Sequence, residues 1–389
     1  MQKKVIAVIF GGMSTEHEVS MMSAKTVISG LSPEKYFVFP IYITKEGKWL
    51  LYEGVVNGLT SAQFESFGTS VVLSPDRAHH GLLRMVGDKV KPIWIDVVFP
   101  VLHGKFGEDG TIQGLCALAG IPCVGSGVLS SAACMDKAVT KLIVSELKIK
   151  QAEHIVVYRS ELENIDETAK KVRYKIKYPC FVKPANAGSS VGVSEVKNKA
   201  ELTAALSLAA EVDYKILVEK AITGRELECA VLGNENPQAA GVGEILPAND
   251  FYDYEAKYSE IGSKTVISPE LPEGAKEKIR QASLSIYKAM ECRGLARVDF
   301  FLEENGDVVF NEINTLPGFT SISMYPMLWK EEGKSLSRLC DELVELAVSE
   351  DEKAEEEKTV CEEPEESKTE AKTETPEPEI PEKEVSADE

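Results

Sequence analysis

The sequence has no C-x-x-C cysteine pair, no apolar run of the roughly 18 residues that a membrane span needs, and no stripe of basic side chains. Its eight cysteines are scattered, which excludes a disulfide framework or a zinc site and is typical of a reduced cytoplasmic protein. The apolar stretch near the start is too short for a signal peptide, so we expect neither export nor membrane insertion. The net charge is −20, and the part of the chain before residue 350 is also acidic and has no basic stripe, which argues against nucleic acid as the main partner.

The acidic charge is concentrated at the end of the chain. Residues 350–389 contain 18 acidic residues and 5 lysines, and they contain no aromatic residue. A segment of this composition cannot bury enough apolar surface to offset the entropy of ordering, so we predict a disordered tail over 349–389. The rest of the chain is only mildly acidic, and its length and composition are typical of two or three globular domains.

Short apolar runs alternate with helical patterns through residues 1–125. The runs 5–10, 36–43, 94–101 and 121–124 predict strands. A helix is expected from Thr15, because Thr15 and Glu18 have the spacing of a capping box. Pro40 within the second run predicts an edge strand or an interruption. The alternation is typical of an α/β fold, so we predict an N-terminal doubly wound parallel-sheet domain in residues 1–125.

Beyond residue 125 the pattern predicts two smaller α+β parts. The first, 126–222, has a predicted helix over 129–148 and strands at 181–183 and 214–219; the second, 223–348, is mainly strands with helices near 273–291 and 335–348. A long loop, 248–268, contains Asp253-Tyr254-Glu255-Ala256-Lys257-Tyr258. This mixture of acid, lysine and tyrosine fits either a lid over a reaction centre or an ordinary surface loop.

The strongest chemical signal is a pair of strand motifs, Arg297-Val298-Asp299 and Asn311-Glu312-Ile313-Asn314. Side chains two apart on a strand share a face, so Arg297 is expected beside Asp299, and Glu312 beside Asn314. If the two strands are neighbours, their oxygen atoms suit Mg²⁺. The alternative is an ion-pair network on a sheet face, and the uncharged amide of Asn314 favours the metal.

Three weaker signals lie near predicted strand ends. Lys183 and the small-residue loop after it offer a charge and N–H groups to phosphates, or form a flexible hairpin. Glu16, after Gly11-Gly12, faces a cleft or only compensates a helix dipole. His103, beside a glycine, is placed for either catalysis or structure. The sequence has neither a Walker A motif nor a G-x-G-x-x-G fingerprint.

Taken in order, motifs from residue 3 to about 345 resemble those of the D-alanine–D-alanine ligases, members of the ATP-grasp superfamily. The motifs are Gly11 to Ser20, Leu102-His103-Gly104, Gly107 to Gly110, Met135-Asp136-Lys137, Lys183-Pro184, Gly188 to Gly192, Tyr252 to Tyr258, Arg297 to Asp299, and Asn311 to Thr320. The resemblance implies a two-part ATP-grasp module, 126–222 and 223–348, after an N-terminal substrate-binding domain. It implies a cytoplasmic homodimer that uses ATP to join two D-alanine molecules through an acyl phosphate, for peptidoglycan synthesis.

The resemblance also implies a role for each site residue. The expected phosphate contacts are Lys137, Lys183, Ser189, Ser190 and Lys257; the adenine contacts are Glu219, Ala221 and Ile222; the ribose contact is Glu226. The expected ligands of two Mg²⁺ or Mn²⁺ ions are Asp299, Glu312 and Asn314. The first D-alanine would be bound by Glu16, Ser189, Tyr258 and His103, the oxyanion by Arg297 and the Gly318 N–H, and the second carboxylate by Ser323. Many family members have an aromatic residue at the position of Ala221, so stacking on adenine is not expected.

Three other classes are compatible with parts of the sequence. Another ATP-grasp ligase would keep the lysines and metal ligands, but need not keep Glu16 together with Tyr258 and Ser323. A NAD-dependent dehydrogenase is disfavoured by the missing glycine fingerprint. A non-catalytic binding protein is disfavoured because Arg297 and the three metal-ligand positions are all present. Lys257-Tyr258 matches the dipeptide-forming type of ligase and leaves D-alanine or D-serine as the second substrate; we expect D-alanine.

Overall fold

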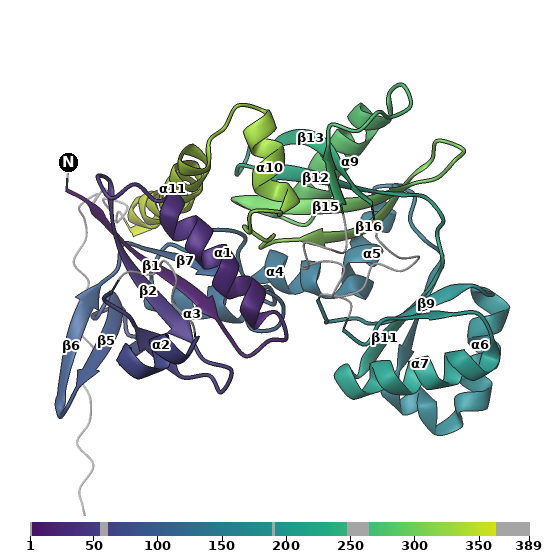
Figure 1. The fold of residues 1–389 in the computed structure, drawn as a ribbon, viewed down its shortest axis with the longest axis horizontal. Coiled ribbons are helices and arrows are strands. Elements are labelled where there is room, and N and C mark those ends of the chain that lie inside the picture. The colour runs from purple at the N-terminus through teal and green to yellow at the C-terminus, as the bar shows by residue number, and fades with distance from the viewer. Residues whose placement is uncertain (1, 55–60, 189–190, 247–263, 363–389) are drawn as a thin grey trace, which may run out of the picture. The chain divides into compact units, whose positions relative to one another are not determined.

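The computed structural model describes residues 2–54, 61–188, 191–246 and 264–362, and its strands form three sheets (Figure 1). Residues 1–351 make up one compact unit, and residues 352–389 are a second one. The first sheet has the order β6-β5-β4-β3-β2-β1-β7. Its strands are β1 (Lys4–Gly11), β2 (Tyr36–Ile43), β3 (Trp49–Leu51), β4 (Thr69–Leu73), β5 (Gly81–Val86), β6 (Lys89–Trp94) and β7 (Val97–Val101).

The first sheet is mixed, so the prediction of a doubly wound parallel sheet was wrong. Strand β1 pairs in parallel with β2 and β7, whereas every pair from β2 to β6 is antiparallel. A tight turn explains one of these antiparallel pairs, because a two-residue connection can join only antiparallel strands. The turn Gly87-Asp88 between β5 and β6 is such a connection, and the Gly-Asp pair in the sequence was the signal for it.

Two further local predictions in this domain were wrong. Pro40 lies inside a continuous β2 between β1 and β3, where its carbonyl accepts a hydrogen bond from the Tyr52 N–H (3.2 Å). Proline is tolerated there because the carbonyl can still accept. The run 121–124 is no full strand; only Cys123 forms an isolated parallel bridge, with Val98.

Helix α1 (His17–Gly30) begins without the predicted capping box. Glu16 occupies the N-cap, and among the described residues its side chain makes no capping hydrogen bond. The hydroxyl of Ser14 instead accepts a hydrogen bond from the Glu16 N–H (3.2 Å) and donates one to the His103 carbonyl (2.7 Å). A serine two residues earlier therefore takes part of the role assigned to Thr15, and it ties the helix start to the end of β7.

The second sheet is antiparallel and has the order β10-β9-β11-β8. Its strands are β8 (His154–Tyr158), β9 (Cys180–Pro184), β10 (Ser194–Val196) and β11 (Lys215–Lys220). Helices α6 (Ile165–Lys175) and α7 (Lys199–Val212) share one apolar core with these strands, and both lie on the same side of them in Figure 1. A short 3-10 helix, η1 (Arg159–Asn164), joins β8 to α6.

The single helix predicted over 129–148 is broken into α4 (Val128–Met135) and α5 (Lys137–Glu146). Helix α3 (Thr111–Ala119) precedes them. The break lies at Asp136, whose carboxylate accepts hydrogen bonds from the Ala138 and Val139 N–H groups and so caps α5. The periodicity of the apolar residues runs through both helices, which is why the sequence suggested one. The break places Lys137 in the first turn of α5.

The third sheet is antiparallel, with the order β14-β13-β12-β15-β16. Its strands are β12 (Arg225–Leu232), β13 (Gln238–Leu246), β14 (Lys264–Ile267), β15 (Leu295–Leu302) and β16 (Val308–Asn314). Along β12, Leu227, Cys229 and Val231 enter the core below α9 (Ala275–Ala289). The alternate residues Ala230 and Leu232 enter a second core, shared with β1, α10 (Met324–Glu331) and α11 (Leu336–Glu362). Burial on both faces holds this sheet firmly in place.

Helix α11 corrects part of the prediction of a disordered tail. It continues to Glu362, through residues 349–362, which we expected to be disordered. This stretch is rich in Glu, which has high intrinsic helix propensity, and Pro364 follows two residues after its end. Residues 363–389 lie outside the described residues, as do residues 247–263 of the predicted long loop. Within the described part of the chain, no helix is long and apolar enough to cross a membrane.

Candidate active site

The two motifs singled out in the sequence lie side by side on β15 and β16. The strands pair with Arg297 opposite Asn314 and Asp299 opposite Glu312. Arg297 donates two hydrogen bonds to Asp299, from Nε to Oδ1 (2.8 Å) and from an Nη to Oδ2 (2.7 Å). Asn314 Nδ2 donates to Asp299 Oδ2 (3.1 Å). The predicted convergence of one guanidinium, two carboxylates and one amide is therefore confirmed.

Arg297 is held by more acidic groups than the sequence suggested. Glu228, opposite Asp299 on β12, places Oε2 3.2 Å from Arg297 Nε. Burial alone would lower the pKa of Arg297, but the charges of Asp299 and Glu228 raise it well above its ordinary value. The guanidinium is thus a permanent cation at the sheet face. Glu228 was missed, although its alternation with Glu226 on one strand marked it as sharing that face.

The oxygen groups of this cluster fit a divalent cation. Carboxylates and an amide oxygen are hard ligands of the kind that Mg²⁺ takes. The Asn314 Nδ2 donates to Asp299, so the Asn314 oxygen points away from that carboxylate. Among the residues the structure describes, no group of three His, Cys, Asp or Glu side chains is arranged to hold a metal alone. That agrees with Mg²⁺ chemistry, because this ion is commonly held by one or two carboxylates together with substrate phosphates.

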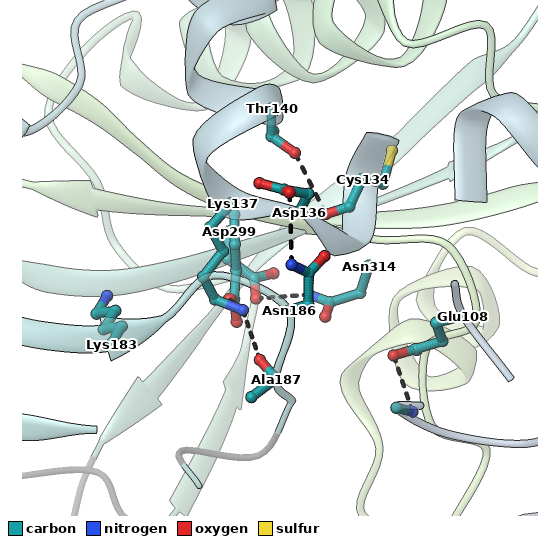
Figure 2. Close-up of polar contacts among 12 residues, drawn as sticks. Glu108, Cys134, Asp136, Lys137, Thr140, Lys183, Asn186, Ala187, Asp299 and Asn314 are labelled. Carbon is teal, nitrogen blue, oxygen red and sulfur yellow. Dashed lines mark hydrogen bonds and ion pairs between the residues drawn. The ribbon is translucent and has the colours of Figure 1, made fainter. Parts of the chain in front are cut away.

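Lysines from two elements, α5 and β9, lie near this oxygen cluster, and Figure 2 shows one from each. Lys137, at the start of α5, lies 3.6 Å from Glu312 Oε2, and its Nζ donates to the Ala187 carbonyl (2.7 Å). Lys183, on β9, forms an ion pair with Glu219 on β11. Both lysines were predicted to contact phosphates, and the structure places both beside acidic groups of the site.

Lys141 completes this group and was missed in the sequence. It lies one turn after Lys137, is 2% exposed, and has its Nζ 3.0 Å from Glu219 Oε2. Burial would raise the pKa of Glu219, but Lys141 and Lys183 hold it well below its usual range. Glu219 is thus a buried carboxylate between two lysines. The i, i+4 spacing of the two lysines in Lys137-Ala138-Val139-Thr140-Lys141 was the available signal.

Glu16 lies where two glycine turns approach each other. A Cβ atom on Gly104 would lie 2.4 Å from Glu16 Oε2, and one on Gly188 would lie 2.6 Å from the same oxygen. Gly104 also has a φ of +66°, which side chains other than glycine rarely adopt. Glu16 is 6% exposed, so its carboxylate is enclosed between these turns. Glu16 is also the N-cap of α1, so its burial favours a role inside the site without excluding compensation of the helix dipole.

His103 connects β7 to residues near the end of the third sheet. Its Nδ1 lies 3.0 Å from the Leu316 carbonyl, and its Nε2 lies 3.2 Å from Ser23 Oγ. Burial lowers the pKa of His103, against the opposing effects of Glu16 and the Leu316 carbonyl. Its ring is therefore predominantly neutral near pH 7 and is fixed at both nitrogens. These contacts keep it next to Glu16 but leave its catalytic role a prediction.

Glu108 is a second acidic group that the sequence did not single out as one. It is half-buried, and its Oε2 accepts a hydrogen bond from the Gly104 N–H (3.1 Å; Figure 2). Burial and the charge of Glu16 raise the pKa of Glu108 to about 8, although Arg297 and Lys137 act in the opposite direction. The enclosed carboxylate of Glu16 therefore lies within the electrostatic influence of Glu108, which keeps its proton near neutral pH.

The predicted binding residues for the second substrate lie together. Ser323 is the N-cap of α10, and its Oγ accepts a hydrogen bond from the Thr320 N–H (2.9 Å). A Cβ on Gly318 would lie 2.9 Å from the same Oγ, so a side chain at position 318 would crowd this hydroxyl. The Phe319 N–H donates to Ser23 Oγ (3.1 Å), which also contacts His103. One serine therefore links this loop to the predicted first-substrate site.

The remaining predicted residues are placed only in part. Ala221 and Ile222 lie in the turn between β11 and β12, and the Ala221 N–H donates to the Pro179 carbonyl (3.1 Å). Glu226, on β12, contributes to the field that raises the pKa of Lys183. Their contacts with a nucleotide stay predictions. Ser189, Ser190, Lys257 and Tyr258 lie outside the described residues.

A mixed-sheet domain is followed by two antiparallel sheets, which bring lysines to a cluster of carboxylates and an amide. This arrangement is that of an ATP-grasp ligase. Two family descriptions match the chain: "D-ala D-ala ligase N-terminus" over residues 5–126 and "D-ala D-ala ligase C-terminus" over residues 143–345. The chain therefore belongs to the D-alanine–D-alanine ligase family, and the resemblance seen in the sequence is confirmed. Its function is that of the family: ATP-dependent formation of the D-alanine dipeptide for peptidoglycan precursors.

Individual relatives agree with this assignment. The chain is 50% identical to a D-alanine–D-alanine ligase of Thermoanaerobacter sp. over 90% of its own length and 97% of the relative's. It is 49% identical to D-alanine–D-alanine ligase B of Clostridium tetani, covering 90% and 95%. Among solved structures, the VanG D-Ala:D-Ser ligase from Enterococcus faecalis is 42% identical with a TM-score of 0.81, covering 89% of this chain and 100% of that one. The D-alanine–D-alanine ligase from Coxiella burnetii is 33% identical with a TM-score of 0.81, covering 92% and 99%.

Proposed function

We propose that the chain forms D-alanyl-D-alanine through an acyl phosphate, with D-alanine as both amino acids. A carboxylate oxygen of the first D-alanine attacks the γ-phosphorus of ATP, and ADP leaves. The amine of the second D-alanine, after losing a proton, attacks the acyl carbon, and the tetrahedral intermediate expels phosphate. The observation that carries the proposal is Arg297, a permanent cation fixed by Asp299 and Glu228 beside the predicted metal ligands.

The lysines and the oxygen cluster would bind the phosphates of ATP. Lys137 and Lys183 would neutralise phosphate charge, which matters because positioning and electrostatics dominate phosphoryl transfer; their positions beside Glu312 and Glu219 support this role. Asp299, Glu312 and Asn314 are the residues that would hold two Mg²⁺ or Mn²⁺ ions. When bound, these ions would neutralise charge on the transferred phosphate. Replacement of Asn314 by alanine should raise the Mg²⁺ concentration needed for half-maximal activity.

The enclosed groups supply the two amino acid sites. Glu16 would bind the ammonium of the first D-alanine, with Ser189 and Tyr258 as supporting residues, and His103 would lie near its carboxylate. Ser323 would bind the carboxylate of the second D-alanine. Arg297 and the Gly318 N–H would stabilise the negative oxygen of the tetrahedral intermediate, which is the usual task of preorganised donors in acyl transfer. Lys257 would contact the transferred phosphoryl group.

D-serine is the alternative second substrate. The specific observation in its favour is the similarity to a ligase described as D-Ala:D-Ser, at 42% identity. Two relatives described as D-alanine–D-alanine ligases, from Thermoanaerobacter sp. and Clostridium tetani, are more similar than this ligase, at 50% and 49% identity over 90% of the chain, and this supports D-alanine.

The test is phosphate release from ATP and Mg²⁺ with D-alanine, D-serine, L-alanine or no amino acid, together with the mass of the product. Release that depends on D-alanine, with a D-alanyl-D-alanine mass, is the expected result. A mixed D-alanyl-D-serine product in preference to the homodipeptide near neutral pH would replace D-alanine as the second substrate. Release with neither amino acid would refute the proposed reaction and point to another carboxylate–amine pair.

Three further proposals concern the state of the protein. The sheets fall into residues 4–101, 154–220 and 225–314, which supports domains at 1–125, 126–222 and 223–348. The seven described cysteines are free, which supports a cytoplasmic location.

For a homodimer, the support is an apolar surface on α3 and α4, where Leu118 and Leu129 are 64% and 67% exposed. A variant with aspartate at both leucines should sediment as a monomer.

A further inference from the structure

Asp136 joins two elements of the predicted phosphate site through opposite sides of its carboxylate. Its Oδ1 accepts hydrogen bonds from the Ala138 N–H (3.0 Å) and the Val139 N–H (3.1 Å), which caps α5. Its Oδ2 forms an ion pair with Lys215 on β11 and lies 3.4 Å from Asn186 Nδ2 in the loop after β9 (Figure 2). One oxygen therefore caps α5, and the other contacts residues of the second sheet and its loop.

A second carboxylate fixes the same asparagine. Asp213 Oδ2 accepts hydrogen bonds from the Asn186 backbone N–H (2.9 Å) and from its Nδ2 (3.0 Å). Asp213 Oδ1 also accepts the Lys215 backbone N–H (3.3 Å). Burial would lower the pKa of Lys215, but its hydrogen bond and charge interaction with Asp136 raise it. The backbone and the side chain of Asn186 are thus both hydrogen-bonded, and its acidic partners Asp136 and Asp213 also contact Lys215.

These contacts set the position of Lys137 relative to the loop. Lys137 follows Asp136 directly, its N–H donates to the Ala185 carbonyl (3.0 Å), and its Nζ donates to the Ala187 carbonyl (2.7 Å). Asn186 lies between these two carbonyls in the chain. The start of α5 and residues 185–187 are therefore bound to each other at three successive residues, immediately before Gly188.

A helix cap alone does not require this arrangement. Capping uses only Oδ1, and α7 shows the simpler case, where Asn198 Oδ1 accepts the Glu201 N–H (3.1 Å) at an exposed helix start. At Asp136 a lysine is partly buried as well, which costs desolvation that a cap would avoid. Charged hydrogen bonds are directional and resist displacement, so the additional contacts fit a need to hold two elements in one geometry.

We propose that Asp136, Asn186 and Lys215 form a positioning cluster that fixes Lys137 and the 185–188 loop for the phosphates of ATP. None of the three is assigned a contact with the reacting atoms, so they act through Lys137 and the loop backbone. The inference rests on the proposed function only for the statement that this region receives the triphosphate. It predicts that weakening the cluster lowers nucleotide affinity selectively, because a displaced lysine and loop lose aligned contacts with phosphate.

The test is calorimetric titration of the full chain with a non-hydrolysable ATP analogue and Mg²⁺. K215M and N186A should each raise the nucleotide Kd about tenfold, the effect of losing one charged or well-aligned hydrogen bond. D136N should show the same loss of affinity, and its melting temperature should fall less than that of D136A, because its amide oxygen still caps α5 although Lys215 loses its anionic partner. D136A should lose both affinity and stability.

N198A is the matched control, since it removes a helix cap away from the site. It should lower the melting temperature and leave the nucleotide Kd unchanged. An unchanged Kd in K215M and N186A, or an equal change in N198A, would overturn the positioning role. The titration needs no amino acid, so a parent protein that binds the analogue but shows no D-alanine-dependent phosphate release refutes the proposed reaction and leaves this inference to be judged by the variants.

Discussion

The Nζ of Lys141 lies 3.0 Å from Glu219 Oε2, and both residues are at least 96% buried. Lys183 pairs with the other oxygen of the same carboxylate. A buried carboxylate between two lysines can give up one partner and remain charged. We therefore interpret Lys141 as the partner that keeps Glu219 charged within the protein interior.

Replacing Lys141 by methionine should destabilise the protein by roughly 1.5–3 kcal/mol, the usual value of a hydrogen bond to a charged group, because Lys183 still balances the charge of Glu219. Denaturant unfolding of the ligand-free protein measures this. The matched control is K150A, because Lys150 also pairs with two acids, Glu303 and Asp307, but is 48% exposed. That variant should lose much less stability, because solvent screens an exposed ion pair. Equal losses in both variants would contradict the structural role given to Lys141.

Replacing Arg297 by alanine should lower turnover at least ~100-fold, the usual result of removing an oxyanion donor. The measurement is steady-state phosphate release at saturating D-alanine and ATP. R84A is the control: Arg84 also makes a double contact with one carboxylate, that of Glu53, but does so on β5 of the first sheet. Its turnover should be unchanged. Near-normal turnover in R297A would remove Arg297 from the mechanism.

Glu108 predicts a pH dependence of stability with a definite sign. Its pKa is raised from 4.5 to about 8, so the folded protein keeps a proton that the unfolded chain loses. The stabilising effect of that proton is fully present below about pH 4.5 and is lost as the pH rises to about 8. E108Q imitates the protonated form and should therefore become the more stable protein across this range, by roughly 1–2 kcal/mol after allowance for solvent screening.

Urea unfolding of the parent and E108Q at intervals from pH 5 to pH 9 would check this. The difference in the free energy of unfolding should grow up to about pH 8 and then level off. E163Q, in the 3-10 helix η1 of the second sheet's domain, is the control and should show no such trend. A difference that is constant with pH would show that Glu108 titrates normally.

A chain that ends at Asp351 should keep full activity. The compact unit ends there, and the match to the family ends at residue 345. A chain that ends at Ser335 should fail to fold, because it lacks the buried residues Leu339, Leu343 and Val344 of α11. Activity and melting temperature of the two truncations measure the difference. Loss of activity in the longer truncation would assign the acidic tail a part in the reaction.

The sequence pattern predicted correctly those features that depend on a single strand. The period of two placed Arg297 with Asp299, and Glu312 with Asn314, on shared faces, and the register of β15 and β16 bears this out. Pattern failed where a short connection set the strand direction, as at Gly87-Asp88, or where a polar residue divided a continuous apolar periodicity, as at Asp136.

The sequence by itself therefore determined the family, the order of its motifs and the faces on which the chemical groups of a single strand lie, because these depend on residues close in the chain. Only the tertiary structure decided that Lys141 meets Glu219, that Glu108 lies within the field of Glu16, and that Asn186 lies between Asp136 and Asp213. Those partners are far apart in sequence and belong to different elements. Their effect on charge and position arises from burial at short distance, which no periodicity within one element specifies.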